Sequence, residues 1–208
     1  MMRLDILQAL ICKFKYQSYL EIGVYRGDCF RKINIECKDG VDPSPVYSDD
    51  KRIHIMTSDQ FFESLSKDKI YDLIFIDGLH DHQQGLKDIN NALEHLSEDG
   101  TIVLHDCNPP NEWQQREISD FDGTGKFNGI VWRSFVETRA KRGNLNMFVV
   151  DCDWGIGVIQ RSDKQDFLKF KCNNKDDITS YKWLEKNRKM ALNLISSKDF
   201  NNWIANEK

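Results

Sequence analysis

Long apolar runs, basic clusters and paired cysteine motifs are all missing from this 208-residue sequence. The longest apolar stretches span about six residues, whereas a helix that crosses a bilayer needs about 20. Four prolines and twelve glycines are too few for a collagen-like chain or a linker. With a net charge of −4 and no basic run, the sequence also lacks the charge pattern of a general nucleic-acid-binding protein. We therefore expect neither a membrane nor a nucleic acid as a partner.

The cysteines lie far apart, and no two of them form a CxxC pair. The first apolar stretch is interrupted by Asp5 and is followed by no small-residue cleavage site, so no secretion signal is predicted. Cysteines in such a chain are expected to be free thiols in the reducing cytoplasm. The six are Cys12, Cys29, Cys37, Cys107, Cys152 and Cys172.

The first half of the chain alternates between strand-like and helix-like apolar patterns. Residues 71–77 form a continuous apolar run, which is typical of a strand buried on both faces in a parallel sheet. The alternation of strands with helices predicts an α/β fold. Strands are predicted at 19–22, 41–43, 53–56, 71–77 and 101–105. Helices are predicted at 3–15, 28–36 and 59–66. A further helix is predicted between the last two strands, where the residues from Leu86 to Leu96 include an apolar face.

The second half begins with a polar segment, residues 106–128, that lacks clear periodicity and suits a lid or a binding loop. A helix is predicted at 129–142. The strands predicted at 145–150 and 154–159 are so close that they must form an antiparallel hairpin. We predict that residues 1–162, with the N-terminal helix, form the main domain and that residues 163–208 form a helical extension of it.

Glycines and carboxylates follow the first two predicted strands. The segment from Glu21 to Gly27 contains Gly23, which would let the chain turn sharply and a ligand approach the backbone. The acid of Glu21 would repel a pyrophosphate and suits a ligand that carries an ammonium group or hydroxyls. Asp42, about twenty residues further on, could accept both hydroxyls of a ribose. An ordinary glycine turn and a turn aspartate before Pro43 remain the alternatives.

Four side chains with acid–base chemistry follow the next two buried strands: Asp77 and His80, then His105 and Asp106. Because ligands of open α/β sheets bind where the carboxyl ends of the strands meet, we expect these side chains to converge. Two carboxylates and two imidazoles could hold a divalent metal or carry out acid–base chemistry. The alternative for His80 is that it only caps the helix that begins near Asp81.

With these motifs the chain resembles a class I S-adenosylmethionine-dependent methyltransferase, of the branch with FIDGxH and HD signatures to which sugar and macrolide O-methyltransferase-like proteins belong. The resemblance covers roughly residues 16–160. It rests on the motifs at 19–27, 41–43, 75–80 and 105–106. It implies a Rossmann-like, seven-stranded sheet with an antiparallel last strand and a three-layer α/β/α architecture.

The resemblance also implies roles for individual residues. The methionine part of S-adenosylmethionine would be bordered by Glu21, Gly23 and Gly27, the ribose would be held by Asp42, and the adenine would lie near Ser58 and Asp59. Asp77 would lie beside the reacting centre. The candidate catalytic residues are Asp77, His80, His105 and Asp106, and either histidine could be the base.

The implied function is methyl transfer from S-adenosylmethionine to an oxygen of a small or sugar-like molecule, by a protein that could form homo-oligomers. Asp77 and Asp106 could hold Mg²⁺, although His105 stands where metal-dependent relatives carry an acid. Two other functions remain open. One is a cofactor-binding domain without catalysis, and the other is a metal-dependent hydrolase or transferase that uses Asp77 and Asp106.

Overall fold

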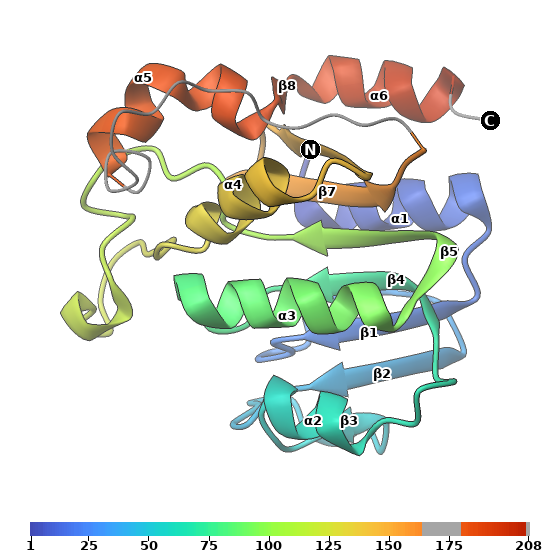
Figure 1. Cartoon of the computed structure of the whole chain (residues 1–208). Coiled ribbons are helices and arrows are strands. Elements are labelled where there is room, and N and C mark those ends of the chain that lie inside the picture. The colour runs from blue at the N-terminus through green and yellow to red at the C-terminus, as the bar shows by residue number, and fades with distance from the viewer. Residues whose placement is uncertain (164–179, 207–208) are drawn as a thin grey trace.

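The computed structural model describes residues 1–163 and 180–206, which form a mixed sheet with helices packed on it (Figure 1). The strand order is β3-β2-β1-β4-β5-β7-β6-β8. The strands are β1 (Ser18–Ile22), β2 (Cys37–Val41), β3 (Ile53–His54), β4 (Tyr71–Ile76), β5 (Leu96–Leu104), β6 (Leu145–Val150), β7 (Ile156–Arg161) and β8 (Leu194–Ile195). The helices are α1 (Arg3–Phe14), α2 (Ser58–Ser64), α3 (His82–Glu94), α4 (Trp132–Lys141), α5 (Tyr181–Leu192) and α6 (Ser197–Asn206).

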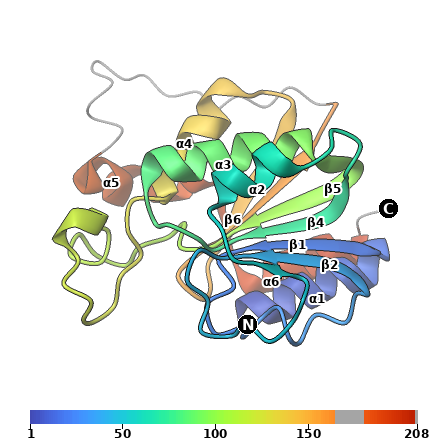
Figure 2. The ribbon, with the colours of Figure 1, turned by 90° about the horizontal axis from the view of Figure 1, so that it is seen from below.

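Helices cover both faces of the sheet (Figure 2). Side chains of α2, α3, α4 and α5 pack in one apolar cluster, and side chains of α1 and α6 pack in the other. Strand β4 contributes to both, with Ile74 and Ile76 on one face and Leu73 and Phe75 on the other. This confirms the predicted three-layer α/β/α fold and explains why the sequence of β4 is apolar at successive positions.

The antiparallel hairpin is confirmed, with β7 running antiparallel to both β5 and β6. The sheet has eight strands rather than the predicted seven, because β8 pairs with β6 in parallel. Asn193 ends α5 in the left-handed conformation, and its Nδ2 donates to the carbonyl of Met147 at 3.0 Å. This contact brings the two residues after Asn193 alongside β6.

The helix predicted at 28–36 is wrong, since the structure has only turns there. The buried ammonium group of Lys38 donates to the carbonyls of Phe30, at 2.5 Å, and Ile33, at 2.7 Å. Those carbonyls would otherwise accept hydrogen bonds along a helix. A hydrophobic segment with turn geometry therefore covers this part of the sheet.

Parallel pairing brings three strand ends to one edge of the sheet. Ile22, the last residue of β1, is in register with Ile76 of β4, which is in register with Leu104 of β5. The residues that follow are therefore adjacent at this edge. Between β5 and α4 the predicted long loop contains one short 3-10 turn, Ile118–Asp120.

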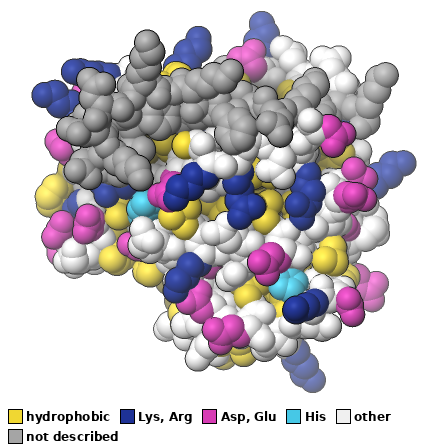
Figure 3. All heavy atoms as spheres, in the orientation of Figure 1, with side chains coloured by type: hydrophobic (Ala, Val, Ile, Leu, Met, Phe, Trp, Pro, Cys, Tyr) yellow, Lys and Arg dark blue, Asp and Glu magenta, His cyan; other side chains and the backbone are white. Residues whose placement is uncertain are grey.

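Part of the predicted 163–208 extension, residues 164–179 with Cys172 and residues 207–208, lies outside the described residues. The other five cysteines are free thiols. Within residues 1–163 and 180–206, no helix is both long and apolar enough to cross a membrane. Side chains of both charge signs are spread over the face seen in Figure 3.

Candidate active site

A cavity of about 1070 Å³ opens at the edge where β1, β4 and β5 end. Its walls include most of the residues predicted for the site: Glu21, Gly23, Asp42, Ser58, Asp77, His80, His105 and Asp106. Gly27 and Asp59 do not line it. The N-terminal residues Met2–Asp5 also line it, which sequence reasoning missed because nothing local connects α1 to these strand ends.

The turn after β1 depends on Gly23, whose φ is +91°. A Cβ atom at this position would lie 2.0 Å from the carbonyl oxygen of Asp77, so no larger residue fits. Asp42 then fixes the turn, since its Oδ2 accepts from the Tyr25 amide at 2.8 Å and its Oδ1 accepts from the Ser44 amide at 2.7 Å. A ligand in the cavity would thus approach a backbone that is already held in place.

The two residues predicted to lie near adenine occupy different positions. Ser58 begins α2 and lines the cavity. Asp59 instead accepts hydrogen bonds from Gln84 Nε2 at 2.9 Å and Lys87 Nζ at 3.0 Å, and so links α2 to α3.

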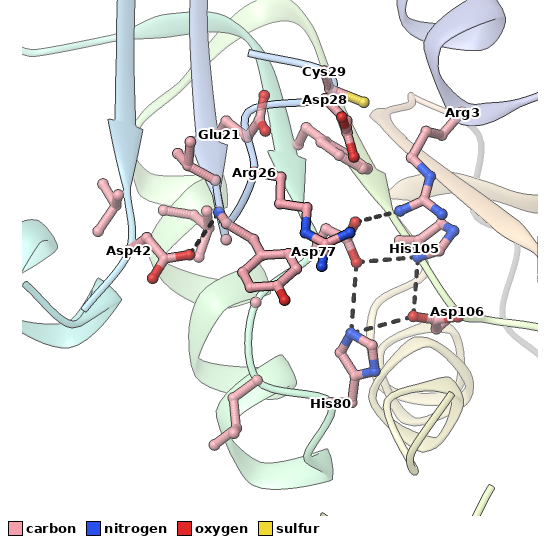
Figure 4. A pocket seen from close by; sticks show the side chains of 18 of the residues that line it. Arg3, Glu21, Arg26, Asp28, Cys29, Asp42, Asp77, His80, His105 and Asp106 are labelled. Carbon is pink, nitrogen blue, oxygen red and sulfur yellow. Dashed lines mark hydrogen bonds and ion pairs between the residues drawn. The ribbon is translucent and has the colours of Figure 1, made fainter. Parts of the chain in front are cut away.

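The four side chains at the ends of β4 and β5 do converge (Figure 4). His105 Nδ1 lies 3.0 Å from Asp77 Oδ1 and 2.9 Å from Asp106 Oδ2. On the other side, His80 Nε2 lies 3.2 Å from Asp106 Oδ2 and 3.6 Å from Asp77 Oδ1. The two carboxylates are thus flanked by two imidazoles, and we call Asp77, His80, His105 and Asp106 the rim cluster.

Three residues that were not predicted hold the rim cluster from outside. Arg3 Nη1 donates to Asp77 Oδ2 at 2.6 Å, and Asn128 Nδ2 donates to Asp106 Oδ1 at 2.6 Å. Asp153, in the β6–β7 turn, offers its carbonyl to His105 Nε2 at 2.9 Å and its carboxylate to Arg3 Nε at 2.9 Å. These contacts join residues that are far apart in the sequence, so no local sequence motif predicts them.

The mutual contacts of the rim cluster shift its pKa values. Burial alone would raise the pKa of Asp77, but the charge and hydrogen bond of His105 hold it well below its usual range. Burial alone would lower the pKa of both histidines, but the neighbouring aspartates raise it, strongly for His105 and less for His80. The arrangement therefore favours charged carboxylates beside a charged His105.

Glu21 has the opposite character. Burial raises the pKa of its carboxyl group from 4.5 to about 8, even though the Tyr19 hydroxyl donates to it at 2.6 Å. Burial at the end of β1 thus favours the protonated form of this carboxyl group.

The loop between β5 and α4 packs directly on His80. The Phe127 ring stacks on the imidazole with 5.6 Å between centroids, and the Ile130 amide donates to the His80 carbonyl at 3.0 Å. Asp81, not His80, caps α3 by accepting from the amides of Gln83 and Gln84. From this loop the cavity is lined by Asp106, Lys126 and Phe127, not by the polar residues of 112–122.

Within residues 1–163 and 180–206, the group of side chains that could hold a metal ion lies in the rim cluster. Asp77, His80 and Asp106 each offer one ligand atom, and these atoms lie within 4.8 Å of one another. However, every carboxylate oxygen of Asp77 and Asp106 already accepts a hydrogen bond from Arg3, His105 or Asn128. Mg²⁺ prefers six oxygen ligands with near-ideal octahedral geometry, so this set of donors does not fit it.

Comparisons with known proteins point to a methyltransferase domain and fold. Residues 20–107 match the family model described as a methyltransferase domain. A comparison with curated protein sequences finds no match.

Solved structures share the fold at low sequence identity. A Klebsiella pneumoniae protein assigned as an O-methyltransferase superposes with a TM-score of 0.58 at 16% identity, over 77% of this chain and 80% of the other. The O-methyltransferase TomG from Streptomyces achromogenes, in complex with S-adenosylmethionine, gives 0.55 at 15%, over 76% and 78%. The methyltransferase PaMTH1 from Podospora anserina, bound to S-adenosylhomocysteine, gives 0.52 at 17%, over 78% and 80%. The chain therefore shares the Rossmann-like fold of these methyltransferases, and its residues 20–107 match a methyltransferase domain.

Proposed function

We propose that this protein transfers the methyl group of S-adenosylmethionine to a hydroxyl oxygen of a small molecule. The observation that carries the proposal is the convergence of the rim cluster on the wall of a cavity that also exposes the glycine turn and Asp42. Those two features suit the cofactor, and the rim cluster suits an acceptor that must lose a proton. The match over residues 20–107 to a methyltransferase domain supports the methyl-transfer activity.

The cofactor would supply an electrophilic methyl group, because its sulfonium already carries a positive charge. The chain's own residues would bind and orient it. Glu21 would face its amino-acid part, Asp42 would accept the ribose hydroxyls, and Ser58 would lie near the adenine. Two backbone amides already fix Asp42, so its side chain would lose little freedom on binding.

His80 is our candidate for the base. The side chain of His105 is only 4% exposed and both of its ring nitrogens are engaged, whereas the His80 side chain is 24% exposed. A proton accepted by His80 would be stabilised by Asp106, 3.2 Å away. Asp77 and Asp106 would hold the ring in position for the transfer.

The acceptor would lie against an apolar wall. Tyr25 and Leu79 line the cavity and are more than half exposed, and Phe127 and Trp154 line it as well. Such a surface suits the flat face of a hydroxylated ring, either a sugar or an aromatic compound. We retain a carbohydrate as one candidate acceptor.

Calorimetry with S-adenosylhomocysteine and a methyl-transfer assay over hydroxylated sugars and phenols would test the proposal. We expect micromolar binding, which corresponds to about 8 kcal/mol, and formation of S-adenosylhomocysteine with at least one acceptor class. Absence of binding would overturn the methyltransferase function. Binding without turnover for every acceptor would favour the non-catalytic cofactor-binding domain instead.

A further inference from the structure

All four carboxylate oxygens of the rim cluster are already in contact with hydrogen-bonding groups of the chain itself. Asp77 Oδ2 accepts from the Arg3 guanidinium, and Asp77 Oδ1 shares the His105 Nδ1–H with Asp106 Oδ2. The remaining oxygen, Asp106 Oδ1, accepts from the Asn128 amide at 2.6 Å. A divalent cation between these carboxylates would have to displace His105 Nδ1.

His105 is a donor at both ring nitrogens. Its Nε2 lies 2.9 Å from the carbonyl oxygen of Asp153, which can only accept, so Nε2 carries a proton. Its Nδ1 lies within 3.0 Å of two carboxylate oxygens, which also accept when ionised, so Nδ1 carries a proton as well. A ring with both protons is an imidazolium cation.

Arg3 supplies the second cation, and its position is fixed independently of His105. Its Nε and its backbone amide each donate to Asp153 Oδ2 at 2.9 Å, while Nη1 reaches Asp77. A guanidinium group remains charged throughout the physiological pH range. The first turn of α1 therefore places a permanent positive charge against the end of β4 (Figure 4).

We propose that Arg3 and His105 together occupy the cation position beside Asp77 and Asp106, so that this site takes no divalent metal and needs none. The two side chains are positioning residues. They hold both carboxylates in place for His80 and offset much of their negative charge. The catalytic role of the rim cluster in this proposal rests on the proposed function. The statement about metal binding does not, because its test measures metal binding and the protonation of His105 directly.

The first test is a titration with Mn²⁺, monitored by electron paramagnetic resonance. The protein is dialysed against a chelator before the titration begins. We expect no saturable binding by the wild type at about 1 mM Mn²⁺. The variant His105→Asp removes the imidazolium and adds an oxygen ligand, so it should bind Mn²⁺ at least tenfold more tightly. The double variant His105→Asp/Asp106→Asn, which lacks one of these carboxylates, should lose that gain. Saturable binding by the wild type that disappears in Asp106→Asn would overturn the proposal.

Nuclear magnetic resonance of the ring nitrogens provides a second measurement that needs no variant to fold. At about pH 7 the His105 ring should give the imidazolium signature at both nitrogens. A neutral ring at about pH 7 would contradict the proposal. Suppose that the wild type binds no metal and has a charged His105, but transfers no methyl group to any acceptor. The proposed function then fails, while this inference stands.

Discussion

Arg3 Nη1 lies 2.6 Å from Asp77 Oδ2, so the first turn of α1 is joined to a residue 74 positions further along the chain. The same guanidinium group binds Asp153, whose side chain is only 1% exposed. Arg3 thus connects the end of β4 to the β6–β7 turn and closes one wall of the cavity.

Replacing Arg3 by Ala should lower the free energy of unfolding by about 1–3 kcal/mol, because it removes the guanidinium partner of the buried Asp153 carboxylate. Urea unfolding measures this change. The matched control is Arg52→Ala, which breaks a surface pair with Asp50 and should cost at most about 1 kcal/mol. Equal losses in the two variants would show that the Arg3 contact contributes no more than a surface pair.

His80→Ala should slow methyl transfer by roughly 10²–10⁴-fold and leave cofactor affinity nearly unchanged, since a base acts on the chemical step. The wild-type rate should rise with pH through the raised pKa of His80, because only the neutral ring can accept a proton. The variant should lack this rise. His82→Ala removes contacts with Glu137 and Gln83 outside the cavity and serves as the control. Loss of cofactor binding together with activity in His80→Ala would instead indicate a structural role.

Asp42→Ala should weaken binding of S-adenosylhomocysteine by about 1–3 kcal/mol, through the lost ribose contacts and the loosened turn at Tyr25. Calorimetry at constant pH measures the effect. The exposed Asp49 of the following turn provides the control variant Asp49→Ala, which should bind normally. Unchanged affinity in Asp42→Ala would place the ribose elsewhere.

Glu21 should make the protein less stable as the pH rises. The folded-state pKa of about 8 exceeds the ordinary value of 4.5, so the folded state retains the proton longer and its stability declines between these two pH values. Glu21→Gln should abolish this part of the decline, on the order of 5 kcal/mol over the full range. Chemical unfolding of both proteins at several pH values tests the prediction, with the exposed Glu63→Gln as control. Parallel pH profiles for the wild type and Glu21→Gln would refute it.

Gly23→Ala should destabilise the protein by more than about 2 kcal/mol, since the new Cβ would overlap the Asp77 carbonyl in addition to the cost of a positive φ. Gly123→Ala isolates the second cost, because Gly123 has a φ of +82° and a Cβ added there would meet no atom within 4 Å. Thermal unfolding should therefore show a clearly larger loss for Gly23→Ala. Similar losses would mean that β1 and β4 can separate at little cost.

The sequence predicts the parts of the fold that depend on local pattern. The apolar run of β4 and the closely spaced hairpin are visible in the residues themselves, and shared strand ends then bring Asp77 and His105 together. The features that the sequence does not predict depend on tertiary contacts. The segment 28–36 has helix-compatible residues, but two of its carbonyls accept hydrogen bonds from the Lys38 ammonium group. Arg3 has no signature at all, because its role exists only once α1 has packed beside Asp77 and Asp153.

The position of Asp153 has a consequence for the order of folding. Strands β1 to β5 could pair before the last hairpin forms, but His105 and Arg3 would then lack the carbonyl and the carboxylate that hold them. The contact between Arg3 and Asp153 closes a loop of 150 residues, which is slow to form because of its entropy. Recovery of ligand binding should therefore lag behind recovery of secondary structure during refolding.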